Sequence, residues 1–234
     1  MSTASVAWWQ VYKLQKTRPF GACRGHTRLL VTSASWPSWF SGSPRKQEMR
    51  DMGTGSSRAG AHGGAWAPSQ SADVEWRTSK LGFDITPLSA EQRDAAASKL
   101  TDFQKSISLG SGTERAFTGK TVNGFSHDNK ARGVYVGAVG GLPLFSSDTK
   151  FDSGTGWPSF YAPVDPEHVI EVHDNSIPFM PRTEVLDARS GGHLGHVFND
   201  GPRPTRKRYC MNAAALEFIE ASKLPPEMKP LLKG

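Results

Sequence analysis

One cysteine, Cys210, is the residue of this chain best placed to do chemistry, and it lies in the segment Arg-Tyr-Cys-Met-Asn at 208–212. If this segment is a strand, its period of two places Arg208, Cys210 and Asn212 on one face. A cation and an amide beside a thiol would suit a cysteine nucleophile, because both can stabilise and orient charge around sulfur. The alternative is a small buried hydrophobic residue, which is common for free cysteines. The spacing alone leaves both interpretations open.

Two histidines, His193 and His196, stand upstream in the Gly-rich segment 190–202. Residues three apart on a straight strand face opposite sides, so both imidazoles reach one site only if Gly195 bends or bulges the chain. Either could act as a general acid near neutral pH. A purely structural role stays open for one of the pair.

A third candidate is Trp157, which the Gly-rich loop 151–156 precedes. A tryptophan on such a loop can form an apolar wall for a small substrate group. The alternative is that Trp157 fills the core.

The elements that must position these residues are short strands separated by Gly, Pro and Asp turns, beginning at Gly133. The absence of a βαβ alternation predicts a compact antiparallel β domain and excludes a doubly wound sheet. A short apolar element follows Leu216, and the Pro-punctuated tail from Pro225 is expected on the surface. The predicted strands are 134–136, 142–145, 169–172, 183–186, 194–198 and 208–212.

A helix is predicted before this β region, over about 90–107. Ser89 and Gln92 have the spacing of a capping box. Apolar residues follow at helical spacing as far as Ile107. The glycines at 110 and 112 end it.

Charge is distributed unevenly along the 234 residues. Residues 1–72 hold nine Lys and Arg against two Asp and Glu, whereas the remainder holds 19 against 20. The C-terminal part therefore offers no bulk electrostatic footprint for nucleic acid. No apolar run approaches the length of a membrane span. Two cysteines are too few for a disulfide framework, which allows a reducing compartment.

The segment 1–75 is expected to be a disordered basic leader. It is rich in Ser and Gly and has no acidic residue before Glu48. This composition resembles that of organellar transit peptides, although the five tryptophans of the segment are unusual for such a peptide. The alternatives are a disordered tail or a start at Met49 or Met52, which would give a cytoplasmic protein. Chloroplast and mitochondrion stay undistinguished. We place the domain at 76–220 and a C-terminal tail at 221–234.

Six collinear motifs resemble those of the B-type peptide-methionine (R)-S-oxide reductases, and the resemblance runs over about residues 88–218. The resemblance implies two antiparallel β-sheets with short flanking helices. It also implies repair of methionine sulfoxide, the known task of this reductase class. The motifs are 112–119, 143–147, 149–160, 182–185, 193–204 and 208–212.

Transferred residue by residue, the resemblance makes Cys210 the nucleophile and Trp157 the residue that packs against the substrate S-methyl group. We place Phe198 beside Trp157 as a substrate-binding residue. The active-site polar shell comprises His193, His196, Arg208 and Asn212.

The implied chemistry is attack of the Cys210 thiolate on the sulfoxide sulfur, while a histidine protonates the oxygen that leaves. We favour His196 as this acid, with His193 alongside. Arg208 and Asn212 are expected to favour the thiolate and to orient the substrate. The step leaves Cys210 as a sulfenic acid.

Many members of the family bind zinc through two Cys-x-x-Cys pairs, and this chain departs from them. The matching positions are Gly137, Gly140, Asp187 and Ser190, none of which is a thiolate. The chain therefore resembles the zinc-free branch, and its stability must come from packing and turns instead of a metal clip.

A second departure is Thr155, where many members carry a resolving cysteine. Cys23 is the other cysteine of the chain, and it lies in the expected leader. The sulfenic acid would then be reduced directly by an external thiol, such as thioredoxin, glutaredoxin or glutathione. We expect a monomer that acts on proteins containing methionine sulfoxide, without nucleic-acid or membrane partners. The competing interpretation is a catalytically silent relative that binds a protein partner.

Overall fold

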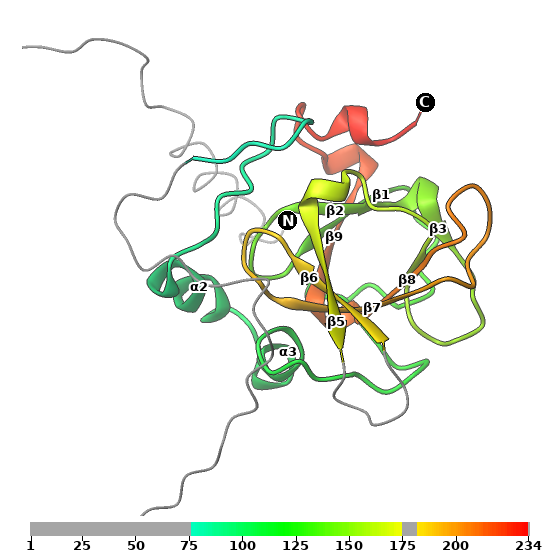
Figure 1. The fold of residues 1–234 in the computed structure, drawn as a ribbon, viewed down its shortest axis with the longest axis horizontal. Helices are drawn as coiled ribbons and strands as arrows, with labels where there is room; N and C mark the ends of the chain where they lie inside the picture. The colour runs from blue at the N-terminus through cyan, green and yellow to red at the C-terminus, as the bar shows by residue number, and fades with distance from the viewer. Residues whose placement is uncertain (1–75, 175–181, 234) are drawn as a thin grey trace, which may run out of the picture. The chain divides into compact units, whose positions relative to one another are not determined.

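The structure, a computed structural model, describes residues 76–174 and 182–233. These residues fall within one unit, Arg58–Gly234. Figure 1 shows two short helices, several 3-10 turns and the strands of two sheets. The helices are α2 (Ala90–Ala97) and α3 (Asp102–Ser108), and the strands are β1 (Gly133–Gly137), β2 (Pro143–Ser146), β3 (Lys150–Phe151), β4 (Ser159–Phe160), β5 (Val169–Asp174), β6 (Arg182–Asp187), β7 (His193–Phe198), β8 (Arg208–Met211) and β9 (Leu216–Glu220).

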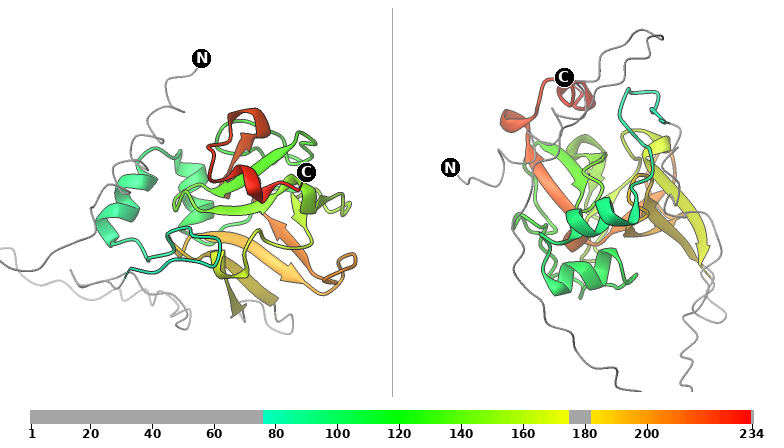
Figure 2. Two further views of the ribbon diagram at one scale, coloured as in Figure 1. Left: turned by 90° about the horizontal axis from the view of Figure 1, so that it is seen from above. Right: turned by 90° about the vertical axis from the view of Figure 1, so that its left-hand side faces the viewer.

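Two antiparallel sheets form the domain, as the sequence predicts. The smaller sheet has the order β2-β1-β9, and the larger has the order β3-β4-β8-β7-β6-β5. Figure 2 shows the sheets as separate layers, with α2 and α3 together at one end. Every residue of β1 is buried, whereas β8 alternates between half-buried and buried side chains. This alternation is typical of a sheet with one face on the core.

Aromatic side chains from both sheets fill the core. Phe145 stacks on Phe160 with ring centroids 4.5 Å apart, and Tyr135 meets Phe160 edge-on at 5.1 Å. Such pairs contribute about 0.5–1.5 kcal/mol beyond the burial of their area. Since Phe160 lies one residue after Ser159 on β4, this packing fixes the strand beside Cys210.

The single helix predicted over 90–107 is wrong, because the structure divides it into α2 and α3. Thr101 starts the second helix with its own capping box: its side chain accepts a hydrogen bond from the Gln104 N–H, and Gln104 caps the Thr101 N–H in return. The apolar periodicity continues across the break, so it concealed the new start. Among the described residues, no helix is long and apolar enough to cross a membrane.

Each of the six predicted strands overlaps an observed one, but β3, β4 and β9 were not predicted as strands. β3 and β4 are two residues long, too short to show a period. The expectation of a surface tail from Pro225 is wrong at Met228, which is buried in the main core cluster. The expected leader lies outside the described residues.

Candidate active site

Strand register places Cys210 in a row of side chains across the larger sheet. Cys210 pairs with Ser159 on β4 and with His196 on β7, and His196 pairs in turn with Glu184 on β6. Residues directly opposite in an antiparallel pair share a face, with β-carbons about 5 Å apart. The thiol, an imidazole and a carboxylate therefore line one face.

The bulge expected at Gly195 is present. Val185 pairs with Gly195 and Leu186 with His193, so the register shifts by one residue between them. A β-carbon on Gly195 would overlap the Cys210 carbonyl oxygen, so only glycine allows β7 to lie this close to β8. The bulge brings the two imidazoles, His193 and His196, to a centroid distance of 5.5 Å.

Each histidine is held by a carboxylate that sequence reasoning did not identify. His193 Nδ1 lies 2.6 Å from Glu184 Oε1, and His196 Nε2 lies 3.0 Å from Asp174 Oδ2, which Arg182 also contacts at 2.8 Å. Its bond to His193 lowers the pKa of Glu184. Burial lowers the pKa of His196 and outweighs its bond to Asp174, so His196 is mainly neutral at pH 7. Glu184 belongs to the motif 182–185, but only the folded structure shows that its carboxylate contacts His193.

The thiol of Cys210 is half-buried, and burial raises its pKa. The Thr155 hydroxyl, 3.7 Å from the sulfur, and the Arg208 charge oppose this rise without cancelling it. Arg208 is itself engaged: it forms a bidentate pair with Asp200 at 2.8 Å for each bond and lies over Phe198 at 4.3 Å. The Arg208 charge lowers the pKa of Cys210, in the direction expected from the sequence, but burial outweighs it and the thiol form is favoured.

Asn212 lies beyond β8, which ends at Met211, and its amide holds main-chain groups. Its Oδ1 accepts a hydrogen bond from the Glu114 N–H at 3.0 Å, and its Nδ2 donates to the Leu194 carbonyl at 3.2 Å and to the Gly112 carbonyl at 3.5 Å. In the described part of the chain, no hydrogen bond joins Asn212 to the thiol. These contacts tie the loop after α3, at Gly112 and Glu114, to Leu194 on β7.

Trp157 is half-buried, and its indole N–H donates to the Glu114 carbonyl at 3.1 Å. Glu114 is buried, and its carboxyl oxygens accept from the N–H groups of Ala213 at 2.6 Å and Ala214 at 2.9 Å. Burial raises the pKa of Glu114 against these bonds. Glu114 lies in the motif 112–119 and was not predicted as a site residue, whereas the structure makes it the anchor of the Trp157 ring.

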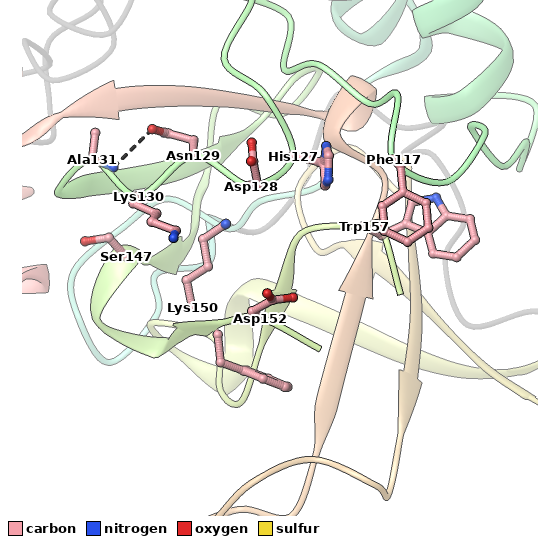
Figure 3. Close-up of a pocket in the computed structure, with 12 residues that line it drawn as sticks. Phe117, His127, Asp128, Asn129, Lys130, Ala131, Ser147, Lys150, Asp152 and Trp157 are labelled. Atoms are coloured by element: carbon pink, nitrogen blue, oxygen red, sulfur yellow. Dashed lines mark hydrogen bonds between the residues drawn. The ribbon is translucent and has the colours of Figure 1, made fainter. Parts of the chain in front are cut away.

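A pocket of about 510 Å³ lies beside this ring. Figure 3 shows Phe117 and Trp157 at one end, with charged side chains toward the other. Cys210 does not line this pocket, although Thr155, its hydroxyl neighbour, directly precedes the lining residue Gly156.

The four positions matched to the family's zinc ligands do converge. A β-carbon on Gly137 or on Gly140 would overlap the Asp187 carboxyl group. Asp187 is fully buried; its Oδ1 accepts from the Arg189 and Ser190 N–H groups at 2.8 and 3.2 Å, while its Oδ2 has no hydrogen-bond partner within the described ranges. With glycine at two of four positions, these residues do not fit a tetrahedral zinc site. Burial raises the pKa of Asp187. In residues 76–174 and 182–233, no group of three or more His, Cys, Asp or Glu could hold a metal ion.

The fold and site define a small antiparallel β domain with a half-buried cysteine–histidine–carboxylate centre. Residues 100–220 match the family model of the SelR domain, so the chain belongs to this family. The chain is 45% identical over 156 residues to the peptide methionine sulfoxide reductase MsrB of Caulobacter vibrioides, covering 67% of this chain and 93% of that protein. Over 120 residues it is 52% identical to the MsrB protein of Leptospira interrogans, covering 51% and 87%.

Proposed function

We propose that this protein reduces methionine sulfoxide in proteins, acts on the R epimer, and uses Cys210 as its nucleophile. The observation that supports this most is the cross-strand pairing of Cys210 with His196 beside the Trp157 loop, in a chain related to peptide methionine sulfoxide reductases. Trp157 would contact the S-methyl group, with Phe198 as a further apolar neighbour.

The raised pKa of Cys210 and the lowered pKa of His196 describe a neutral thiol beside a neutral imidazole. Transfer of the thiol proton to His196 would generate both the nucleophile and the acid, as in other cysteine–histidine pairs. The acid then protonates the sulfoxide oxygen, with His193, held by Glu184, alongside. Overall, one thiol and one sulfoxide give one sulfenic acid and one thioether. Cys210 is oxidised by two electrons, and no net proton is consumed.

An external thiol would then return the sulfenic acid to the thiol. A hydroxyl, not a second thiol, lies 3.7 Å from the Cys210 sulfur, at Thr155. A sulfenic acid there has no neighbouring thiol among the described residues with which to condense. We therefore propose direct reduction by thioredoxin, glutaredoxin or glutathione. Cys23 lies outside the described residues, and a Cys23–Cys210 disulfide in the mature protein after turnover would contradict this route.

The deciding experiment is reduction of separate R and S epimers of N-acetyl-methionine sulfoxide with dithiothreitol. We expect activity on the R epimer only, and none in Cys210→Ser. Thr155→Ser is the matched control, because it keeps the hydroxyl beside the sulfur and should keep most activity. Activity of Cys210→Ser, or a wild-type protein inactive on both epimers, would refute the proposal. The second outcome would favour the catalytically silent alternative.

Expectations from the sequence about oligomeric state, zinc, domain bounds and location complete the proposal. We propose a monomer without zinc, in which domain 76–220 is preceded by a leader of 75 residues and followed by a tail at 221–234. We propose import into a chloroplast or mitochondrion. Metal analysis of the purified protein checks the absence of zinc, and the N-terminus of the mature protein in cells checks the leader.

A further inference from the structure

Phe117 is an exposed aromatic residue with a strained backbone. Of the large hydrophobic side chains in the described residues it is the most exposed, at 65%. Its φ of 65° lies in the left-handed region, which is a genuine outlier for a bulky residue. Strain of this kind is energetically costly and is concentrated at functional sites. The fold therefore holds an apolar ring in water at a cost that core packing does not explain.

Contacts with the Trp157 loop hold Phe117 in place. The Phe117 N–H donates to the Gly156 carbonyl at 2.8 Å. A β-carbon on Gly156 would lie 2.6 Å from the Phe117 nitrogen and 2.7 Å from ring atoms, so glycine is needed for this approach. His127 meets the ring edge-on, with centroids 6.1 Å apart. Phe117 and Trp157 thus form one aromatic wall of the 510 Å³ pocket.

The other end of the pocket is polar but electrically balanced. Lys130 and Lys150 lie there with Asp128 and Asp152, as Figure 3 shows. Two cations and two anions sum to no net charge, which gives no reason to favour an acidic or a basic ligand. An apolar wall with a few balanced donors and acceptors suits an uncharged side chain and its peptide backbone.

The pocket begins one residue from the reaction centre. Thr155 places its hydroxyl 3.7 Å from the Cys210 sulfur, and the next two residues, Gly156 and Trp157, line the pocket. In an extended peptide, side chains two positions apart point to the same side and lie about 7 Å from each other. A methionine sulfoxide at Cys210, with its methyl group on Trp157, would thus direct a side chain two residues away toward Phe117.

We propose that Phe117 and the adjoining pocket form a subsite for an apolar side chain two residues from the methionine sulfoxide of a protein substrate. The subsite rests on the proposed function and selects among oxidised methionines: those flanked by leucine or an aromatic residue at this position are repaired first.

Peptides in a Gly-Ser host, each with one methionine-R-sulfoxide, test this directly. Leucine or serine is placed two residues before or two residues after the sulfoxide. For the wild type we expect kcat/KM about tenfold higher with leucine at one of these positions, since burial of part of a leucine side chain accounts for that ratio. In Phe117→Ala the ratio should fall toward one, and in Phe117→Leu most of it should remain. Phe103→Ala is the matched control, because Phe103 is comparably exposed at 57% but lies on α3, and its ratio should equal the wild-type ratio.

The ratio is measured within each variant, so a change in folded fraction cancels. A ratio of one in the wild type at both positions, or a ratio that persists in Phe117→Ala, overturns the subsite. A rise in the KM for the thiol reductant in Phe117→Ala with an unchanged leucine ratio assigns the pocket to the reductant and also overturns it. A wild type inactive on N-acetyl-methionine-R-sulfoxide instead refutes the proposed function, which separates the two failures.

Discussion

Substituting Asn212 by alanine should weaken the fold before it affects chemistry. Its side chain is 3% exposed and joins the Glu114 N–H to the Leu194 carbonyl. Alanine would leave the buried Glu114 N–H unpaired, whereas the Leu194 carbonyl would keep the bond that it accepts from the Asn212 main-chain N–H at 2.7 Å. An unsatisfied buried group costs about 1–3 kcal/mol, so we expect Asn212→Ala to lower the free energy of unfolding by about 2 kcal/mol.

Urea unfolding followed by tryptophan fluorescence measures this loss. The matched control is Asn123→Ala, because Asn123 bridges the Phe218 carbonyl and N–H in the same manner, at 2.7 and 3.2 Å, away from Cys210. Asn123 is exposed, so water can replace part of its bonding, and the expected loss is about 1 kcal/mol. If Asn212→Ala unfolds within about 0.5 kcal/mol of wild type while kcat falls more than about a hundredfold, the structural assignment is refuted and Asn212 acts on the substrate.

Two further predictions concern Asp187, at a position matched to the family's zinc ligands, and Thr155, the neighbour of Cys210. The folded pKa of Asp187 lies above its unfolded value, so the unfolded state binds fewer protons and wild-type stability falls as pH rises above the ordinary aspartate pKa of about 4. Asp187→Asn lacks this loss, so its stability relative to wild type should rise as the pH increases above about 4, by at most about 1.4 kcal/mol per pH unit; a difference constant with pH in urea titrations would contradict it. Thr155→Cys should convert the product of one turnover without reductant from a sulfenic acid to an intramolecular disulfide, because position 155 lies within contact of Cys210. Mass spectrometry that finds the two thiols still unlinked would show that the loop holds them apart.

Local signals in the sequence were sufficient for most elements. The strands on either side of the site have apolar runs and Gly or Asp turns, and six of them were predicted near their observed bounds. The capping box at Ser89 was predicted correctly because it depends on residues three apart. The same local rule operates at Thr101, yet a helical apolar pattern that crosses the break hid it. Two-residue strands have no pattern at all: β4 exists because β3 and β8 pair with it.

The site residues likewise divide into those that could be predicted from the sequence and those that only the structure revealed. The residue types alone selected Cys210, the two histidines and Trp157 as candidates, and the condition that Gly195 must bulge followed from the period of a strand. The carboxylates Glu184 and Asp174 could not be assigned, because register across three strands brings them to the imidazoles. Nor could sequence show that burial raises the pKa of Cys210, since the desolvation of a thiol depends on everything packed around it.

The sequence by itself determined the residues available for chemistry in the predicted domain: Cys210 with His193 and His196 before it, no cysteine at the four positions matched to the family's zinc ligands, and an antiparallel β domain to carry them. Tertiary structure decided the charge state and the partners. It turned Asn212 from the presumed substrate face toward main-chain groups, and it held the Phe117 ring at the surface beside Trp157. The physical reason is the separation along the chain over which each effect acts. Propensity, capping and periodicity act over a few residues, whereas hydrogen-bond partners and desolvation are set by segments that lie far apart in the chain.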